Sequence, residues 1–296
     1  MRQSVICFGE VLWDVFPDGE KIGGAPLNAA LRLNELGISS AIVSKIGEDD
    51  LGNRLLAYIT DQNLNTAFMQ IDPLHETGQV RVQLDEKGSA SYTIAHPAAW
   101  DKIDVLPALK EAVALSDAFL FGSLVARDSV SKNTLKALLP KAKFKVFDVN
   151  LRAPHYSFAI LKELMLEAHL IKFNDDELDE IAKDLGCSSK EMKEQVLYIA
   201  SQTKTKKICV TRGGDGALLY LDGNFIEQKG FPIRVKDTVG AGDSFLATLL
   251  EGLLKKSSPT VTLQRACAMG ALVAGATGAN PKIREEELTQ FIQKHA

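Results

Sequence analysis

The chain has 296 residues, 46% of them hydrophobic and 24% charged, which is enough for one large α/β domain or for a domain with a small appendage. A formal net charge of -4 and the lack of any Lys/Arg cluster argue against nucleic-acid binding. Four scattered cysteines without a C-x-x-C pair, no recognisable leader and no apolar run of membrane-spanning length lead us to expect a reduced, cytoplasmic protein without membrane partners.

Short β-branched runs alternate with helical patterns along the chain. Strands are predicted at residues 4–9, 41–47, 117–122, 144–150, 169–174 and 207–212. Amphipathic helices are predicted between most of them, for example at 49–63 and 128–139. This alternation predicts an α/β fold in which helices cover both faces of a mostly parallel central sheet.

Two segments break this alternation. Residues 78–95 alternate polar and apolar side chains around a turn, which predicts a β-hairpin; the turn residues are Glu86, Lys87, Gly88 and Ser89. Residues 10–22 also look extended, so the two segments can form a small separate sheet. Because no linker or repeat is visible, we expect a single domain over residues 1–296 that carries this sheet as an insertion.

A glycine-rich turn, 240-GAGD-243, precedes the apolar helical pattern that runs to Leu254. The first amides of a helix have no partner within it and carry the positive end of its dipole, so Gly240, Ala241 and Gly242 can cradle an anion, most commonly phosphate. Asp243 could simply cap the helix, but capping needs no glycines. A carboxylate beside an anion site suits the removal of a proton from a hydroxyl that attacks phosphorus.

A second glycine pair, Gly23 and Gly24, precedes a predicted helix with Asn28 in its first turns. An ordinary helix entry explains this pattern about as well as close approach to a polar small molecule, whose hydroxyls Asn28 would meet with a donor and an acceptor. Asp14 falls at the end of the first strand region, where parallel sheets bind ligands. It could face solvent or hold two sugar hydroxyls.

The two glycine motifs are similar to those of a kinase family. G-G-x-P-x-N and the spaced glycines after it match Gly23, Gly24, Pro26, Asn28, Gly37 and Gly47, and D-T-x-G-A-G-D matches residues 237–243. The chain therefore resembles the ribokinase-like, or PfkB, family of carbohydrate kinases over essentially its whole length. The resemblance implies a ribokinase-like fold, with lid strands at about 10–22 and 78–95, and a Mg²⁺-dependent transfer of the γ-phosphoryl group of ATP to a sugar hydroxyl.

The resemblance also implies residue roles. Asp243 would be the catalytic base, and the amides of residues 240–242 would form the anion hole for the γ-phosphoryl group. The family's N-x-x-E motif matches Asn174 to Glu177, which would organise Mg²⁺ and the phosphates, with Glu177 acting indirectly. Without the resemblance, 175-DDELDE-180 would be interpreted as the acidic first turn of a helix.

The nucleotide and cation sites are implied in the same way. Residues 211–219 match the family's nucleotide-binding turn, where Thr211, Gly214 and Gly216 would lie near the phosphates, although a plain hairpin turn is the alternative. Asn280 is assigned to the nucleotide site, and its loop, 274–280, would complete a K⁺ site with Asp237 and Val239.

The sugar is predicted from three local similarities. The D-x-N-x-R segment of fructokinases and ketodeoxygluconate kinases contacts substrate or phosphate, and Asn150 and Arg152 match it after a strand end. The Trp13–Asp14 pair and 23-GGAPLN-28 look most like fructokinases. We expect D-fructose, giving fructose 6-phosphate, ahead of 2-keto-3-deoxygluconate, whose carboxylate Arg152 or Arg81 would meet, and of ribose or a nucleoside. A catalytically silent sugar or nucleotide sensor is the alternative outside enzymes.

The lid of the family closes over sugar and excludes water. In the predicted hairpin, one face carries Val80, Val82 and Leu84, and the other carries Arg81, Gln83 and Asp85. Because one face must cover the sugar, the other is free to meet a second lid. This alternation predicts a homodimer through the lid.

Overall fold

The computed structural model describes residues 3–16, 19–84 and 90–295. Its larger sheet contains the strands β1 (Ser4–Phe8), β4 (Ser39–Gly47), β5 (Asn65–Asp72), β8 (Ala118–Gly122), β9 (Lys145–Asp148), β10 (Leu170–Asn174), β11 (Lys207–Thr211), β12 (Ala217–Leu221) and β13 (Asn224–Gln228). All six predicted strands are present within two residues of their expected bounds. The alternation did not predict β5, β12 and β13.

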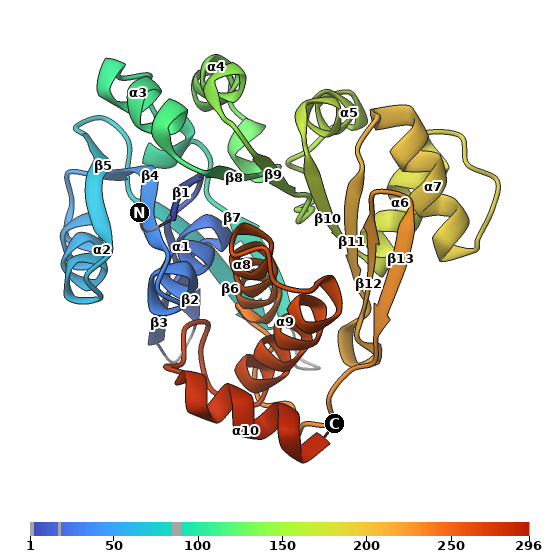
Figure 1. Ribbon diagram of the computed structural model, residues 1–296. Coiled ribbons are helices and arrows are strands. Elements are labelled where there is room, and N and C mark those ends of the chain that lie inside the picture. The colour runs from blue at the N-terminus through green and yellow to red at the C-terminus, as the bar shows by residue number, and fades with distance from the viewer. Residues whose placement is uncertain (1–2, 17–18, 85–89, 296) are drawn as a thin grey trace.

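The nine strands lie in the order β13-β12-β11-β10-β9-β8-β1-β4-β5 (Figure 1). Neighbouring strands are parallel from β5 to β11, and only the β11–β12 and β12–β13 pairs are antiparallel. The predicted α/β fold with a mostly parallel sheet is therefore confirmed. The carboxyl ends of the parallel strands meet at one edge, where such sheets bind ligands.

Helices cover both faces of this sheet (Figure 1). One face packs against α1 (Ala25–Glu35), α2 (Asp50–Asp61), α8 (Ala241–Leu254), α9 (Pro259–Ala274) and α10 (Glu285–His295). The other packs against α3 (Pro107–Leu115), α4 (Ser129–Leu138), α5 (Phe158–Glu167), α6 (Asp175–Asp184) and α7 (Met192–Thr203). Short 3₁₀ turns are η1 (Ala99–Lys102), η2 (Leu124–Ala126), η3 (Leu139–Lys141) and η4 (Gly213–Asp215). No helix in the described part of the chain could span a bilayer.

Alternate residues of each central strand enter opposite cores. In β1, Cys7 lies in the core beneath α1 and α8, whereas Phe8 lies in the core beneath α3 and α4. The second core contains a row of rings in which Phe121 stacks on Phe147 with centroids 5.2 Å apart. Burial on both sides explains why these strands are continuous apolar runs in the sequence.

A small sheet stands apart from the large one. It contains β2 (Leu12–Phe16), β3 (Gly19–Gly23), β6 (Gly78–Leu84) and β7 (Ala90–Ile94), in the order β3-β2-β6-β7. The segments 10–22 and 78–95 thus do form a common sheet, through parallel pairing of β2 with β6. Val80 is buried and Arg81 is exposed, as the alternation predicts. The predicted turn at 86–89 and the side chains of residues 82–92 lie outside the part of the chain that the structure describes.

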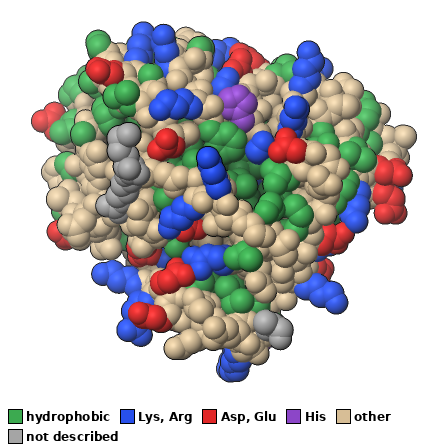
Figure 2. Space-filling model, in the orientation of Figure 1, with side chains coloured by type: hydrophobic (Ala, Val, Ile, Leu, Met, Phe, Trp, Pro, Cys, Tyr) green, Lys and Arg blue, Asp and Glu red, His purple; other side chains and the backbone are tan. Residues whose placement is uncertain are grey.

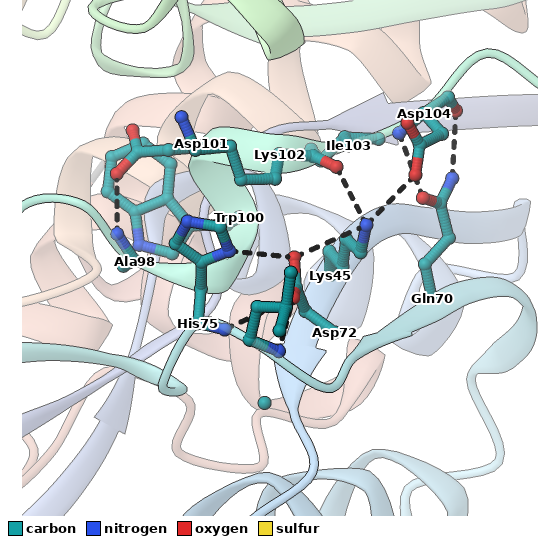
Figure 3. A network of polar contacts seen from close by, with 12 residues as sticks. Lys45, Gln70, Asp72, His75, Ala98, Trp100, Asp101, Lys102, Ile103 and Asp104 are labelled. Carbon is teal, nitrogen blue, oxygen red and sulfur yellow. Dashed lines mark hydrogen bonds and ion pairs between the residues drawn. The ribbon is translucent and has the colours of Figure 1, made fainter.

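Polar contacts hold the base of the small sheet to the large one. Lys45 of β4 forms ion pairs with Asp72 at 3.3 Å and Asp104 at 2.9 Å (Figure 3). It thereby joins the end of β5, where the chain leaves for β6, to the segment that follows η1. On the other side, the indole nitrogen of Trp13 donates to the carbonyl of Leu51 in α2 at 3.0 Å. The Trp13 contact thus holds a strand of the small sheet, whereas the Lys45 contacts hold the segments before β6 and after β7.

Charged side chains are dispersed over the surface. On the face in Figure 2, Lys and Arg side chains are interspersed with Asp and Glu rather than gathered into one continuous basic patch. This distribution fits the formal net charge of -4.

Candidate active site

Helix α8 begins at a turn that only glycine fits. Gly240 precedes the helix with φ +77°, and a methyl group added to it would lie 2.3 Å from the carbonyl oxygen of Ala279. The preceding loop is held by Asp237, which accepts hydrogen bonds from the amides of Val239 at 3.1 Å and Gly278 at 3.2 Å. The first amides of α8 are therefore positioned by two loops that meet in front of the helix.

Asp243 does not cap its helix. Gly240 occupies the capping position, and no described side chain makes a capping hydrogen bond there. Instead, Oδ2 of Asp243 accepts a hydrogen bond from Nδ2 of Asn28 at 2.8 Å. Oδ1 of Asn28 in turn accepts one from Nδ2 of Asn280 at 2.7 Å. This chain of side chains joins α8, α1 and the 274–280 loop, and it fixes the orientation of the carboxylate.

The glycine pair places the start of α1 beside the small sheet. Gly23 ends β3 and Gly24 precedes α1. A methyl group on Gly23 would lie 2.5 Å from Oδ2 of Asp14, so the carboxylate lies directly against the glycine. The predicted position of Asp14 at the end of a main-sheet strand is wrong. The chain leaves the large sheet after β1, and Asp14 is in the middle of β2.

A buried arginine, which the sequence analysis missed, braces the same elements. Arg32 of α1 is 1% exposed; its Nε donates to Oγ of Ser244 at 3.2 Å, and its Nη2 donates to the carbonyl of Pro281 at 2.8 Å. Its third contact is an ion pair with Glu35. Arg32 therefore holds the residue after Asp243 and the residue after Asn280 to one helix. The available signal was an arginine within the apolar pattern 29-AALRL-33.

A second missed group lies beneath the glycine turn. Lys172 of β10 pairs with Asp148 of β9 at 3.0 Å, and both are buried. Burial disfavours the ammonium, but Asp148 and Glu177 prevail and raise the pKa of Lys172 to about 12. Its Nζ would lie 3.6 Å from a methyl group on Gly242. The helix start thus has a permanent positive charge below it. The available signal in the sequence was a lysine within an apolar strand.

Burial raises the pKa values of three acidic side chains in the site. It raises the pKa of Asp243 to about 6; nearby Asp148 adds to this shift, and the hydrogen bond from Asn28 opposes it. Burial likewise raises the pKa of Glu10, also missed from the sequence, to about 7. Oε2 of Glu10 is buried without a hydrogen-bond partner among the described residues. The pKa of Asp14 is raised by burial to about 6.

Asn150 and Arg152 follow β9, as predicted. Arg152 is exposed, and its charge lowers the pKa of Asp14, Glu10 and Asp243 against the effect of burial. Arg152 is therefore the cation that faces this acidic group. Asn150 is half-buried with φ +39°, and its carbonyl accepts a hydrogen bond from Oγ of Ser123 at 3.4 Å.

Asn174 and Glu177 cap α6 reciprocally. The amide of Glu177 donates to Oδ1 of Asn174, and the amide of Asn174 donates to Oε2 of Glu177, both at 2.8 Å. Oε1 of Glu177 accepts from the amide of Leu151 at 2.9 Å. Each oxygen of Glu177 thus holds one amide, which fixes the orientation of the carboxylate. The described residues contain no group of three His, Cys, Asp or Glu side chains that could hold a metal.

The turn after β11 connects two antiparallel strands, as the hairpin alternative states. Thr211 lies beside Asn174 in neighbouring strands, so the structure brings these two predicted nucleotide ligands together. Gly216 is needed for close packing of the backbone, because a methyl group there would lie 2.0 Å from the carbonyl oxygen of Gln228. Gly214 is exposed, and a methyl group added to it would meet no atom within 4 Å.

The chain matches a family of known proteins. The model of the pfkB family of carbohydrate kinases matches residues 3–286. The chain belongs to this family. It is a phosphotransferase that acts on a sugar hydroxyl, and its ribokinase-like fold is the one expected from the motifs.

Several fructokinases are similar to this PfkB chain. The fructokinase of Salmonella typhimurium is 26% identical over 300 residues, covering 94% of this chain and 95% of the relative. The structure of the Xylella fastidiosa fructokinase with bound ATP superposes with a TM-score of 0.88 at 21% identity and 99% coverage of both chains. A Vibrio cholerae fructokinase bound to fructose, ADP and potassium gives a TM-score of 0.84 at 23% identity and 98% coverage of both.

The pKa of Asp243 predicts the acid limb of the pH profile. A base must be deprotonated to act, so kcat/KM should fall as the pH drops below about 6. Asn28→Ala removes a hydrogen bond that lowers this pKa, and the midpoint of the limb should move to higher pH. Asn34→Ala, at the other end of α1, is the matched control and should leave it in place. A wild-type profile that is flat from about pH 5 to about pH 8 would contradict this assignment.

Proposed function

We propose that the protein is an ATP-dependent fructokinase that converts D-fructose into fructose 6-phosphate. The observation that carries the proposal is the Asn280–Asn28–Asp243 chain, which orients a carboxylate at the start of α8, where the amide of Ala241 donates to the carbonyl of Thr238 at 3.3 Å. The similarity to fructokinases over nearly the whole chain supports the choice of sugar. A silent sensor is less suitable, because a protein that only binds sugar has no use for an oriented base.

The proposed transfer assigns one task to each part of the site. Asp243 takes the proton of the sugar hydroxyl as its oxygen attacks the γ-phosphorus of ATP. A new bond forms between that oxygen and phosphorus, the bond from phosphorus to the β-phosphate oxygen breaks, and ADP leaves. The amides of Gly240 and Gly242 would stabilise the charge on the transferred group, the amide of Ala241 would first have to leave the carbonyl of Thr238, and Lys172 adds a positive charge below them. A donor of this kind contributes roughly 3 kcal/mol.

Mg²⁺ fits the site mainly through the nucleotide. Because both oxygens of Glu177 accept amide hydrogen bonds, Asn174 and Glu177 would hold the ion through water while phosphate oxygens supply direct ligands. Bound there, Mg²⁺ would neutralise phosphate charge. Thr211, next to Asn174, and the exposed Gly214 would border the phosphates, together with Asn280, which donates to Asn28.

The charges around the site are mixed. Arg152 acts on Asp14, Glu10 and Asp243, Lys21 also acts on Asp14 and buried Lys172 also acts on Asp243, so the choice of a neutral sugar rests on the similarity to fructokinases. We propose that Asp14, Asn28 and Asn150 bind hydroxyls beside Gly23 and Gly24, with the small sheet acting as a lid. Ketodeoxygluconate, ribose and nucleosides remain the competing substrates in the assay below.

The substrate is tested by coupled detection of ADP over a panel of sugars with ATP and Mg²⁺. Fructose should give the highest kcat/KM, and 2-keto-3-deoxygluconate and ribose should give lower values. Asp243→Ala should reduce kcat by about 10² to 10⁴ with little change in the KM for sugar. Asp184→Ala, an exposed acid at the end of α6, is the control and should match the wild type. No turnover of any ketose would overturn the fructose assignment, and binding without ADP release would favour the sensor.

We also propose a K⁺ site formed by main-chain carbonyls near Asp237, Val239 and the 274–280 loop. Asp237 joins these segments through its hydrogen bonds, and Nζ of Lys21 lies 3.3 Å from its Oδ2. Activity should therefore rise with K⁺ concentration. Lys21→Gln removes a competing positive charge, so half-maximal activation should need less K⁺. Lys110→Gln, exposed on α3, is the control; activity that ignores K⁺ would rule the site out.

We also propose that the protein forms a homodimer and lies in the cytoplasm. The outward residues of the small sheet, such as the exposed Arg81, leave room for a homodimer through that sheet. Sedimentation at working concentration should give twice the chain mass, and a monomer mass would refute the dimer. All four cysteines are free thiols, as suits a protein of the reducing cytoplasm.

A further inference from the structure

The ammonium of Lys172 has more hydrogens than partners. Its side chain, on β10, is 7% exposed, and Nζ lies 3.0 Å from Oδ1 of Asp148. No other side chain or carbonyl in the described part of the chain pairs with this ammonium. An ammonium has three N–H groups, so two of them lack an acceptor from the protein. Because a buried donor without a partner is costly, a further acceptor at Nζ would be stabilising.

Nζ borders an unfilled space at the start of α8. A methyl group added to Gly242 would lie 3.6 Å from Nζ of Lys172, and no other described atom outside the local helix turn would lie within 4 Å of it. A Cβ is about 2.5 Å from its own backbone nitrogen, so Nζ lies within about 6 Å of the amide nitrogen of Gly242. That amide, in the first turn, has no partner within α8. The ammonium and the amide therefore border the same small space.

The fold does not account for a glycine at position 242. Gly240 is required by its φ of +77° and by the nearby carbonyl of Ala279. Gly242 has no positive φ, and 3.6 Å is an ordinary contact for a methyl group. Alanine would stabilise this helix turn, because glycine loses more backbone entropy on folding. The missing side chain instead keeps the space beside Nζ open, which favours a ligand there.

Three carboxylates keep Lys172 charged without filling this space. Burial lowers the pKa of Lys172, but Asp148, Glu177 and Asp243 outweigh burial and raise the pKa to about 12. Both oxygens of Glu177 hold backbone amides, and Oδ2 of Asp243 accepts from Asn28. Lys172 is therefore a permanent cation at neutral pH with unused donors.

The transfer proposed above uses Lys172 only as a positive charge beneath the helix start. We propose that Lys172 is a further catalytic residue, whose unused N–H groups donate hydrogen bonds to oxygens of the transferred phosphoryl group, and that Asp148 is the positioning residue that holds it there. Lys172 keeps its proton throughout, because the proton of the sugar hydroxyl goes to Asp243. This role rests on the proposed anion hole at residues 240–242.

Lys172→Met tests the contact, because methionine has a similar length without the charge. With the sugar that the wild type phosphorylates best, kcat should fall by about 10² to 10³, as for the loss of one oxyanion donor. Calorimetry with Mg²⁺ should show about tenfold weaker binding of a non-hydrolysable ATP analogue, whereas ADP, which lacks the γ-phosphoryl group, should bind as it does to the wild type. Lys145→Met, at the first residue of β9 and paired with Glu167, is the control and should match the wild type.

Gly242→Ala tests the space itself. The methyl group fits beside Nζ at 3.6 Å, so the temperature of unfolding should not fall. It would occupy the position proposed for the phosphoryl oxygens, so kcat and the affinity for the ATP analogue should fall as they do in Lys172→Met. A wild-type kcat in this variant would contradict the placement of the phosphoryl group.

A purely structural ion pair predicts a different result. Loss of one member leaves an uncompensated buried charge, whereas loss of both restores the balance. In the double variant with Asp148→Asn and Lys172→Met, thermal unfolding should be close to that of the wild type, and kcat should stay as low as in Lys172→Met. If Lys172→Met alone does not fold, the double variant carries the test.

Recovery of the wild-type kcat in the double variant, or unchanged affinity for the ATP analogue in either variant, overturns the proposal. A wild type that phosphorylates no sugar would instead refute the proposed function, and the calorimetric comparison would still test Lys172.

Discussion

The structure of the site depends on the hydrogen bond between Asn28 and Asp243, which are 215 residues apart in the chain. That bond brings the starts of α1 and α8 together, and with them two helix dipoles whose positive ends lie near one point. Arg32 joins the same two helices through Ser244, and Asn280 holds the amide of Asn28. These polar contacts keep one carboxylate in place, which is the preorganisation that phosphoryl transfer requires.

Charge balance is the second constraint. Three carboxylates with raised pKa values, on Glu10, Asp14 and Asp243, lie at the junction of the small and large sheets. The ion pair of Lys172 with Asp148 is buried beneath them, and Arg152 and Lys21 act on them from the surface. Such a cluster destabilises the folded chain, because burial disfavours each charge. Its presence is best explained by catalysis rather than by packing.

The large sheet and the helix starts could be predicted from the sequence because their signals are local. A strand buried on both faces is an apolar run, and a helix entry is marked by glycines next to an apolar pattern. The edge strand β5 mixes exposed and buried residues, and β12 and β13 form a hairpin without intervening helices, so neither fits the alternation. Asp14 was misplaced because the sequence does not show where the chain leaves one sheet for another. Arg32, Lys172 and Glu10 were missed because charged residues in apolar segments acquire their roles from partners far along the chain.

The two oxygens of Glu177 have a consequence beyond capping. One holds the end of β10, on the proposed nucleotide side, and the other holds Leu151, between Asn150 and Arg152 on the proposed sugar side. A ligand that displaces either amide changes the constraint on the other loop. By thermodynamic reciprocity, the two substrates should then alter each other's dissociation constants by the same factor. A single carboxylate, which contacts neither the phosphate donor nor the sugar, would thus couple the binding of the two substrates.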